Sequence, residues 1–255
     1  MKRKGNFGGI FAMALILVLT LVLSVGSGSA AEPTIVDSGN CGKDGSNVTW
    51  TLDSAGLLTI SGTGEMADYE SKTDSASGEE ITTAPWGNQA KTVVIEDGVT
   101  GIGAAAFYGC SGLTSVTMGS NVTSIGESAF CGCTGLTGEL TISENVTTIG
   151  SYAFKGCTEM TGVKLPSKLE TIGSYAFDST GLTALELPAT LKSVGDSAFQ
   201  KTKIKTLNLP DGLNLTEGSE FAECAELTEV SVGGNLAAYG TFSSCAALTT
   251  ITVRE

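Results

Sequence analysis

The stretch VTSIGESAFCGCTGLTGELTI at residues 122–142 contains a motif that returns along most of the chain. Its next copy, VTTIGSYAFKGCTEMTGVKLP at residues 146–166, keeps the Ile-Gly pair, the Ala-Phe pair and the apolar run that follows. The anchors of the copies are spaced 21 to 24 residues apart, and every phenylalanine outside the first 31 residues is one of them: Phe107, Phe130, Phe154, Phe177, Phe199, Phe221 and Phe242. A unit this short cannot bury its own apolar face, so the copies must stack into a solenoid with one continuous core.

Each copy predicts the same local structure. Runs such as LTSVTM at residues 113–118 have apolar residues at the spacing of a β-strand, and a proline marks the following turn in three copies (Pro166, Pro188, Pro210). We therefore expect a mostly β fold with short helical or 3-10 turns and a parallel sheet on one face. The phenylalanine rings should form an internal spine.

Five of the seven cysteines share a second repeat position, three residues after each phenylalanine. That position holds Cys110, Cys133, Cys157, Thr180, Thr202, Cys224 and Cys245. Alternation between Cys and Thr indicates a small side chain with a weak donor facing a turn, and so a structural ladder rather than a metal or redox site. Neighbouring ladder positions would lie about 4.8 Å apart. A disulfide between them is sterically feasible, although the threonine copies fill the same place without a partner.

The other two cysteines lie off this ladder. Cys131 shares its position with a varied, mostly polar set, which predicts a solvent-facing site: Tyr108, Lys155, Asp178, Gln200, Ala222 and Ser243. Cys131 is expected to be unpaired at the surface or joined to Cys41. The odd total of seven leaves at least one cysteine without an intramolecular partner.

These motifs resemble the BspA-like leucine-rich repeats of bacterial secreted and surface proteins, over residues 93–255. The resemblance implies a leucine-rich repeat solenoid of about seven repeats and a role in adhesion to host or microbial surface proteins. The last two copies depart from the pattern, because Gly218 comes one place late and Thr241 replaces the alanine before the phenylalanine. We interpret them as the closing end, since terminal repeats are commonly atypical.

Two segments precede the repeats. Residues 1–31 read as a signal peptide, with Lys2, Arg3 and Lys4 before an apolar run and small residues at its end. After cleavage we expect a secreted or cell-surface protein with no membrane insertion. Residues 32–92 are expected to form an N-terminal β cap with a hairpin at 48–61 and an acidic loop at 66–86, whose acids lack the spacing of a calcium loop.

Charge and composition exclude several function classes. Without the leader, 11 basic residues stand against 27 acidic ones, a net charge of −16 that repels phosphate backbones and anionic lipids. The chain has no histidine, which removes the commonest general base and metal ligand. We therefore predict no nucleic-acid partner, no metal, no cofactor and no catalytic residue.

The outward-facing strand positions are the candidate partner-binding residues. By period-two alternation they are Ser115, Thr117, Glu139, Thr141, Lys164, Glu186, Thr206, Asn208, Glu229, Ser231, Thr250 and Thr252. A second candidate is the basic cluster of Lys201, Lys203 and Lys205, which could orient an acidic partner or simply offset neighbouring acids.

Three functions remain in view. The first is a non-enzymatic protein-protein interaction module with an extracellular protein partner. The second is a structural or assembly module of a larger surface layer, with end-to-end self-association through an uncovered final coil. The third is a carboxylate-dependent hydrolase, which is disfavoured because the acids of the face do not lie on adjacent strands.

Overall fold

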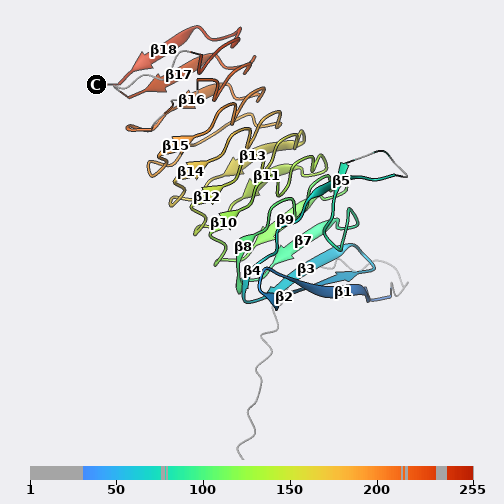
Figure 1. The fold of residues 1–255 in the computed structure, drawn as a ribbon. Coiled ribbons are helices and arrows are strands. Elements are labelled where there is room, and N and C mark those ends of the chain that lie inside the picture. Colours follow the sequence, from blue (N-terminus) through green and yellow to red (C-terminus); the bar gives the residue numbers. More distant parts are fainter. Residues whose placement is uncertain are drawn as a thin grey trace, which may run out of the picture. The chain divides into compact units, whose positions relative to one another are not determined.

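A computed structural model describes residues 31–75, 78, 80–213, 215, 218–233 and 240–254. The described residues belong almost entirely to one compact unit, Pro33–Glu255 (Figure 1). The expected signal peptide lies outside the described residues except for Ala31. In the described part of the chain, no helix could cross a membrane.

The first sheet has five strands in the order β1-β2-β3-β7-β9. Its strands are β1 (Ile35–Gly42), β2 (Gly45–Asp53), β3 (Leu57–Gly62), β7 (Thr92–Ile95) and β9 (Ser115–Met118). β2 and β3 pair antiparallel, with Trp50 opposite Ile60, which confirms the hairpin expected at 48–61. β3 then pairs parallel with β7, and β7 with β9. The cap and the first coils thus share one sheet, and the division at residue 92 stays a prediction.

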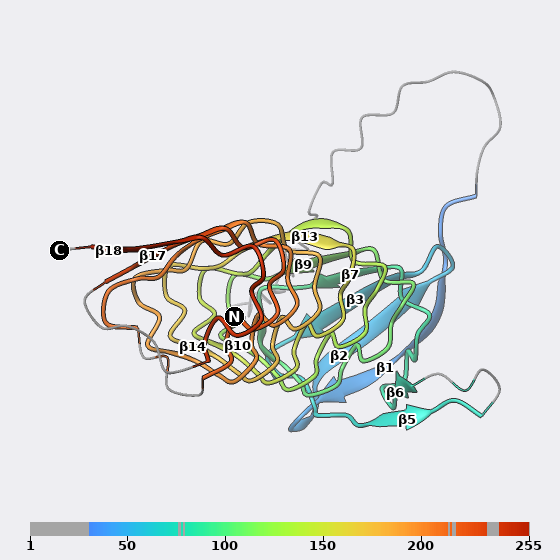
Figure 2. The same cartoon turned by 90° about the horizontal axis from the view of Figure 1, so that it is seen from above.

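A second sheet runs along the other side of the coils, in the order β15-β14-β12-β10-β8-β4 (Figure 2). Its strands are β4 (Gly64–Glu65), β8 (Val99–Ile102), β10 (Ser124–Ile125), β12 (Thr148–Ile149), β14 (Thr171–Ile172) and β15 (Ser193–Val194). The Ile-Gly pairs explain it, because each isoleucine is buried while the glycine allows the next coil to approach. A Cβ at Gly150 would lie 2.7 Å from the backbone of Gly126 and Glu127.

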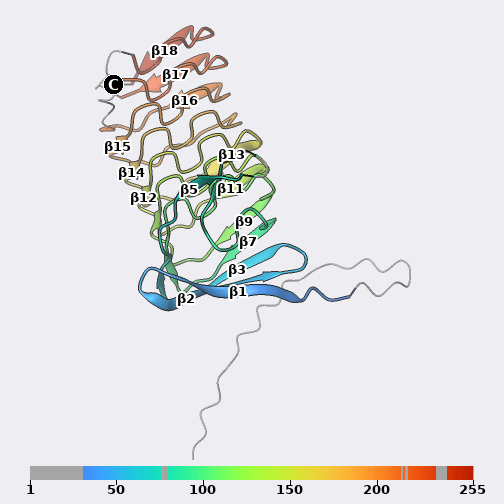
Figure 3. The ribbon, with the colours of Figure 1, turned by 45° about the vertical axis from the view of Figure 1, so that its right-hand side comes forward.

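The remaining strands form three smaller sheets. They are β11 (Gly138–Thr141) with β13 (Met160–Lys164), β16 (Thr206–Asn208) with β17 (Glu229–Val232) and β18 (Thr250–Val253), and the hairpin β5 (Ser71–Thr73) with β6 (Glu80–Thr82). Within these three sheets, every pair except the β5–β6 hairpin is parallel. The face of β7 and β9 is therefore continued along the stack by short, separate sheets (Figure 3).

The phenylalanine spine is confirmed. Successive rings from Phe107 to Phe242 stack with centroids 4.9–5.9 Å apart and interplanar angles of 3–25°. Trp86 starts the spine, 5.6 Å from Phe107. The sequence analysis missed Trp86 because its coil lacks both the Ile-Gly and the Ala-Phe pairs.

The expected short helical or 3-10 turns are wrong, because the described residues contain strands and turns but no helix. Single bonds of the 3-10 type do occur, such as Cys157 N donating to Phe154 O at 3.2 Å. They do not continue into a helix, because the residues two before and two after the phenylalanines adopt positive backbone φ angles, except before Phe221, where Gly218 takes this role one place earlier. Tyr152 (φ 59°) and Gly156 (φ 72°) are one such pair.

Candidate interaction face

Strand alternation places the predicted binding residues on one side of the stack, which we call the sheet face. On β17, Val230 and Val232 are buried, whereas the Glu229 side chain is exposed to solvent. All the predicted residues of the sheet face are exposed except Ser231, which is half-buried. Glu186 belongs to a coil that forms no strand at this position.

The register of the strands brings these side chains into rows. Thr206, Glu229 and Thr250 stand opposite one another on β16, β17 and β18. Asn208, Ser231 and Thr252 form a second row beside them in the same three strands. At this end, the sheet face therefore presents two rows of hydroxyl and amide groups with one carboxylate.

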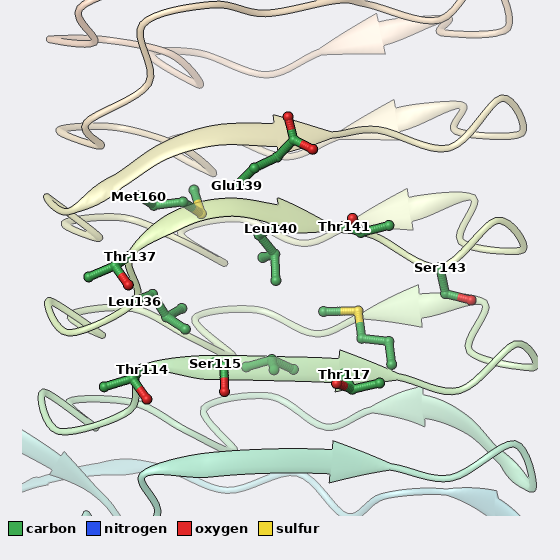
Figure 4. A pocket seen from close by; sticks show the side chains of 12 residues that line it. Thr114, Ser115, Thr117, Leu136, Thr137, Glu139, Leu140, Thr141, Ser143 and Met160 are labelled. Atoms are coloured by element: carbon green, nitrogen blue, oxygen red, sulfur yellow. The ribbon is translucent and has the colours of Figure 1, made fainter. Parts of the chain in front are cut away.

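Strand pairing along the sheet face is interrupted between β9 and β11, which belong to different sheets. The coil that begins at Phe130 is 24 residues long, and its β11 starts with a bulge at Gly138 (φ 73°). A bulge bends the strand and disrupts pairing. The outcome is a hollow of about 340 Å³ between the two strands (Figure 4).

The hollow combines an apolar lining with a hydroxyl rim. Val116, Leu140 and Met160 contribute apolar groups, and Val116 is only half-buried although Val163, Leu207 and Val230 at the same repeat position are buried. The hydroxyl-bearing side chains around it are Thr114, Ser115, Thr117, Thr137, Thr141 and Ser143. The sequence signal for this hollow was the extra residue in the 24-residue copy.

A second hollow, of about 370 Å³, lies further along the sheet face. Glu139, Lys164 and Glu186 line it together with Leu165 and Leu185. Glu139 also lines the first hollow, and its side chain leans over Gly162, where an added Cβ would be 3.3 Å away. Charges of both signs thus flank an apolar surface, an arrangement suited to a polypeptide partner.

The structure divides the lysine cluster. Lys201 pairs with Glu223 at 3.8 Å, and the nearby Lys192 pairs with Glu170 at 2.8 Å, so both offset acids of neighbouring coils. Lys203 and Lys205 are exposed and make no ion pair within the described residues. Only these two lysines remain as candidates for steering a partner.

The cysteine ladder is confirmed as structural. The Cys133 thiol donates to Phe107 O at 3.1 Å and the Cys157 thiol to Phe130 O at 3.2 Å, in each case the carbonyl of the preceding coil. Thr180 fills the same position by donating to Phe177 O at 2.8 Å. Burial raises the pKa of Cys133 and Cys157, so these thiols are poor nucleophiles. Within the described residues, no group of three or more Cys, Asp or Glu could hold a metal ion.

The off-ladder positions differ from expectation. Cys131 is half-buried rather than fully exposed, and desolvation raises its pKa. Cys41 is buried in the core of the cap, and both thiols are free, so the suggested pair does not form in this structure. Asp178, expected to face solvent, is buried because Lys155 covers it with an ion pair of 3.0 Å.

Lys155 belongs to a cluster that the sequence analysis missed. The rings of Tyr152 and Tyr175 stack at 5.1 Å, and Lys155 Nζ lies 5.5 Å and 5.0 Å from their centroids. The signal was present in the identical GSYAF at residues 150–154 and 173–177. This cluster ties the adjacent turns around Phe154 and Phe177 together on the turn side of the stack.

Comparison with known sequences places the repeats in a family. A profile described as "BspA type Leucine rich repeat region (6 copies)" matches residues 86–201 and 148–255, which together make up more than half of the chain. The chain belongs to the BspA-type leucine-rich repeat family. This family and fold are those of protein-interaction modules, which are typically non-enzymatic.

Comparison with solved structures gives matches to bacterial proteins. A leucine-rich repeat protein from Eubacterium ventriosum is 21% identical over 85% of each chain, with a TM-score of 0.36. The T. pallidum leucine-rich repeat protein TpLRR is 24% identical over 72% of this chain and 78% of its own, with a TM-score of 0.43. The pneumococcal vaccine antigen PcpA is 15% identical over 81% and 68%, with a TM-score of 0.48. No curated protein gives a match. These similarities assign no function to this chain.

Proposed function

We propose that this protein is a non-enzymatic adhesion module that acts in secreted or cell-surface form and binds an extracellular protein of host or microbial origin through its sheet face. The observation that carries the proposal is the interruption between β9 and β11, where the half-buried Val116 and Met118 line a hollow inside a rim of hydroxyl groups. Protein interfaces have this composition, with an apolar centre and a polar, hydrogen-bonding rim.

The geometry of the sheet face favours a large partner over a small ligand. Its two hollows adjoin through Glu139, and the hydroxyl rows of β16 to β18 extend the same side of the stack. A solenoid presents an extended surface of this kind, on which many modest contacts add up. The mature chain's strong negative charge supports a protein partner over nucleic acid or an anionic membrane.

Export is supported by the leader. Lys2, Arg3 and Lys4 precede an apolar run and small residues, which is the pattern of a secretory signal peptide. Cleavage would release the repeat unit outside the cytoplasm, where a surface partner is met. N-terminal sequencing of the exported protein tests this step, and a mature protein that still starts at Met1 would contradict it.

Binding by full-length mature protein tests the main proposal. The protein is used to capture partners from host extracellular matrix and microbial surface extracts, and one captured partner is then titrated against variants. Thr117→Arg fills the rim of the hollow and should abolish capture. Thr148→Arg is the matched control, because Thr148 is also an exposed threonine and lies on β12 in the opposite sheet. Equal binding by both variants would remove the sheet face from the function.

The two lysines without ion pairs give a second readout of the same partner. Lys203→Gln with Lys205→Gln should slow association and weaken its salt dependence if the partner is acidic. Lys192→Gln is the control, since that lysine already pairs with Glu170. An unchanged association rate at low salt would leave the sheet face as the sole binding surface.

An assembly role is favoured by one observation at β18. Ile251 and Val253 are 47% and 57% exposed, and among the described strands β18 pairs only with β17. An open strand edge with apolar side chains invites pairing with another chain. Sedimentation of the mature chain over a range of concentrations tests this role. If the chain self-associates through β18, Ile251→Lys should keep it monomeric. A concentration-independent monomer would exclude it.

A further inference from the structure

Two ladder thiols lie next to each other at the C-terminal end of the described stack. β17 and β18 pair in parallel with Glu229 opposite Thr250, so Cys224 and Cys245, each five residues earlier, occupy equivalent places in adjacent coils. Both thiols point into the turn. Cys224 donates to Phe199 O and Cys245 to Phe221 O, each at 3.2 Å.

Side chains at this ladder position touch from one coil to the next. Thr202 Oγ1, one coil before Cys224, lies 3.2 Å from the Cys224 sulfur. On the other side, Cys245 is the equivalent residue of the following coil. Adjacent strands are about 4.8 Å apart, within the Cα separations of about 4.4–6.8 Å that a disulfide spans. The spacing of paired strands is therefore compatible with a disulfide between these two positions.

The two thiols differ in their surroundings. Cys224 is buried, whereas Cys245 is only half-buried because its coil is less covered. The neighbouring Cys224 thiol lowers the pKa of Cys245 to about 7. By contrast, Cys110, Cys133 and Cys157 are all buried, and burial raises their pKa values. Cys245 thus combines access with thiolate character, and Cys224 lies within reach of it.

We propose that Cys224 and Cys245 form a thiol modification site that low-molecular-weight disulfides convert into a disulfide between the last two described coils. The Cys245 thiolate attacks one sulfur of the reagent, whose S–S bond breaks and releases the first thiolate. Cys224 then loses its proton to solvent and attacks the Cys245 sulfur, which releases the second thiolate. The two protein thiols lose two electrons, which reduce the reagent to two thiols. The product closes the chain between residues 224 and 245 and holds the last described coil on the stack.

Oxidised glutathione is the probe for this reaction. Reduced full-length mature protein is incubated with it, trapped with iodoacetamide and mapped by mass spectrometry without reduction. We expect a linked pair of peptides containing Cys224 and Cys245, with loss of about 2 Da. Cys110, Cys133 and Cys157 should remain thiols that alkylate only after unfolding. A linkage between other cysteines, or no reaction of native Cys245, would overturn the proposal.

Threonine variants separate the two roles, and they suit the fold because Thr180 and Thr202 occupy the same ladder position. In Cys224→Thr, the mixed disulfide of Cys245 with glutathione should accumulate because no second thiol resolves it. In Cys245→Thr, Cys224 should stay unmodified in the native protein. Cys157→Thr is the matched control and should form the linkage as the wild type does. Accumulation of the mixed disulfide in the wild type would overturn the resolving role of Cys224.

Discussion

The coil of Phe154 and Cys157 and the coil of Phe242 and Cys245 have the same residues at the same two repeat positions, yet their environments differ. In each, the cysteine thiol donates to the carbonyl of the preceding coil at 3.2 Å. Phe154 and Cys157 are fully buried, whereas Phe242 and Cys245 are only half-buried. One neighbouring coil therefore provides the hydrogen bond, but burial needs a coil on both sides.

This difference is expected for a solenoid, in which each repeat contacts only the repeats next to it. Phe154 stacks on Phe130 at 5.2 Å and on Phe177 at 5.3 Å, while among the described residues Phe242 has one ring partner, Phe221, at 5.9 Å. In repeat proteins, stability is close to a sum of repeat and interface contributions. The same side chain should then contribute more in the middle than in the last described coil.

Truncation of the spine gives the largest expected effect. Phe154→Ala leaves a cavity between two stacked rings and should lower the free energy of unfolding by about 3–5 kcal/mol. Phe242→Ala should cost clearly less, because that ring is only partly buried and stacks on one ring among the described residues. Urea denaturation of the two variants measures the difference. Equal losses would contradict the argument that burial comes from both sides.

A smaller effect is expected from the ion pair on the turn side. Lys155→Ala should lower the free energy of unfolding by about 1–3 kcal/mol, because the Asp178 carboxylate is left buried with its main charged partner removed. Its side chain is only 6% exposed. The remaining side-chain bond to Asp178 comes from the Ser179 hydroxyl at 3.0 Å.

The control for this variant is a lysine without an ion pair. Lys203→Ala should stay within about 0.5 kcal/mol of the wild type, as ordinary surface changes do. The same denaturation assay compares the two. If Lys155→Ala matched Lys203→Ala, the pair would be a surface contact with no role in tying the coils together.

The sequence predicts the stack well, because its period is set by residues with one structural role each. The phenylalanine spine, the Cys/Thr ladder and the outward position of residues such as Glu229 all follow from register alone. The hollow between β9 and β11 was harder to predict, because one extra residue can be absorbed as a bulge, a wider turn or a shift of register. The burial of Asp178 could not be predicted either, because a side chain from the preceding coil, that of Lys155, covers it.

Substitutions at the left-handed turn positions of the same two coils should have the smallest effect on stability. Gly156 (φ 72°) and Ser244 (φ 59°) occupy the same place, two residues after Phe154 and Phe242. Gly156→Ser should cost about 1 kcal/mol from backbone conformation, because the nearest atoms to an added Cβ are 4.0 Å away and leave room for it. Ser244→Gly relieves the same conformation, but glycine loses more backbone entropy on folding, so the net gain should be about 0.5 kcal/mol. Thermal unfolding of both variants checks the opposite signs, and destabilisation by Ser244→Gly would show that the serine side chain contributes more than its backbone angle costs.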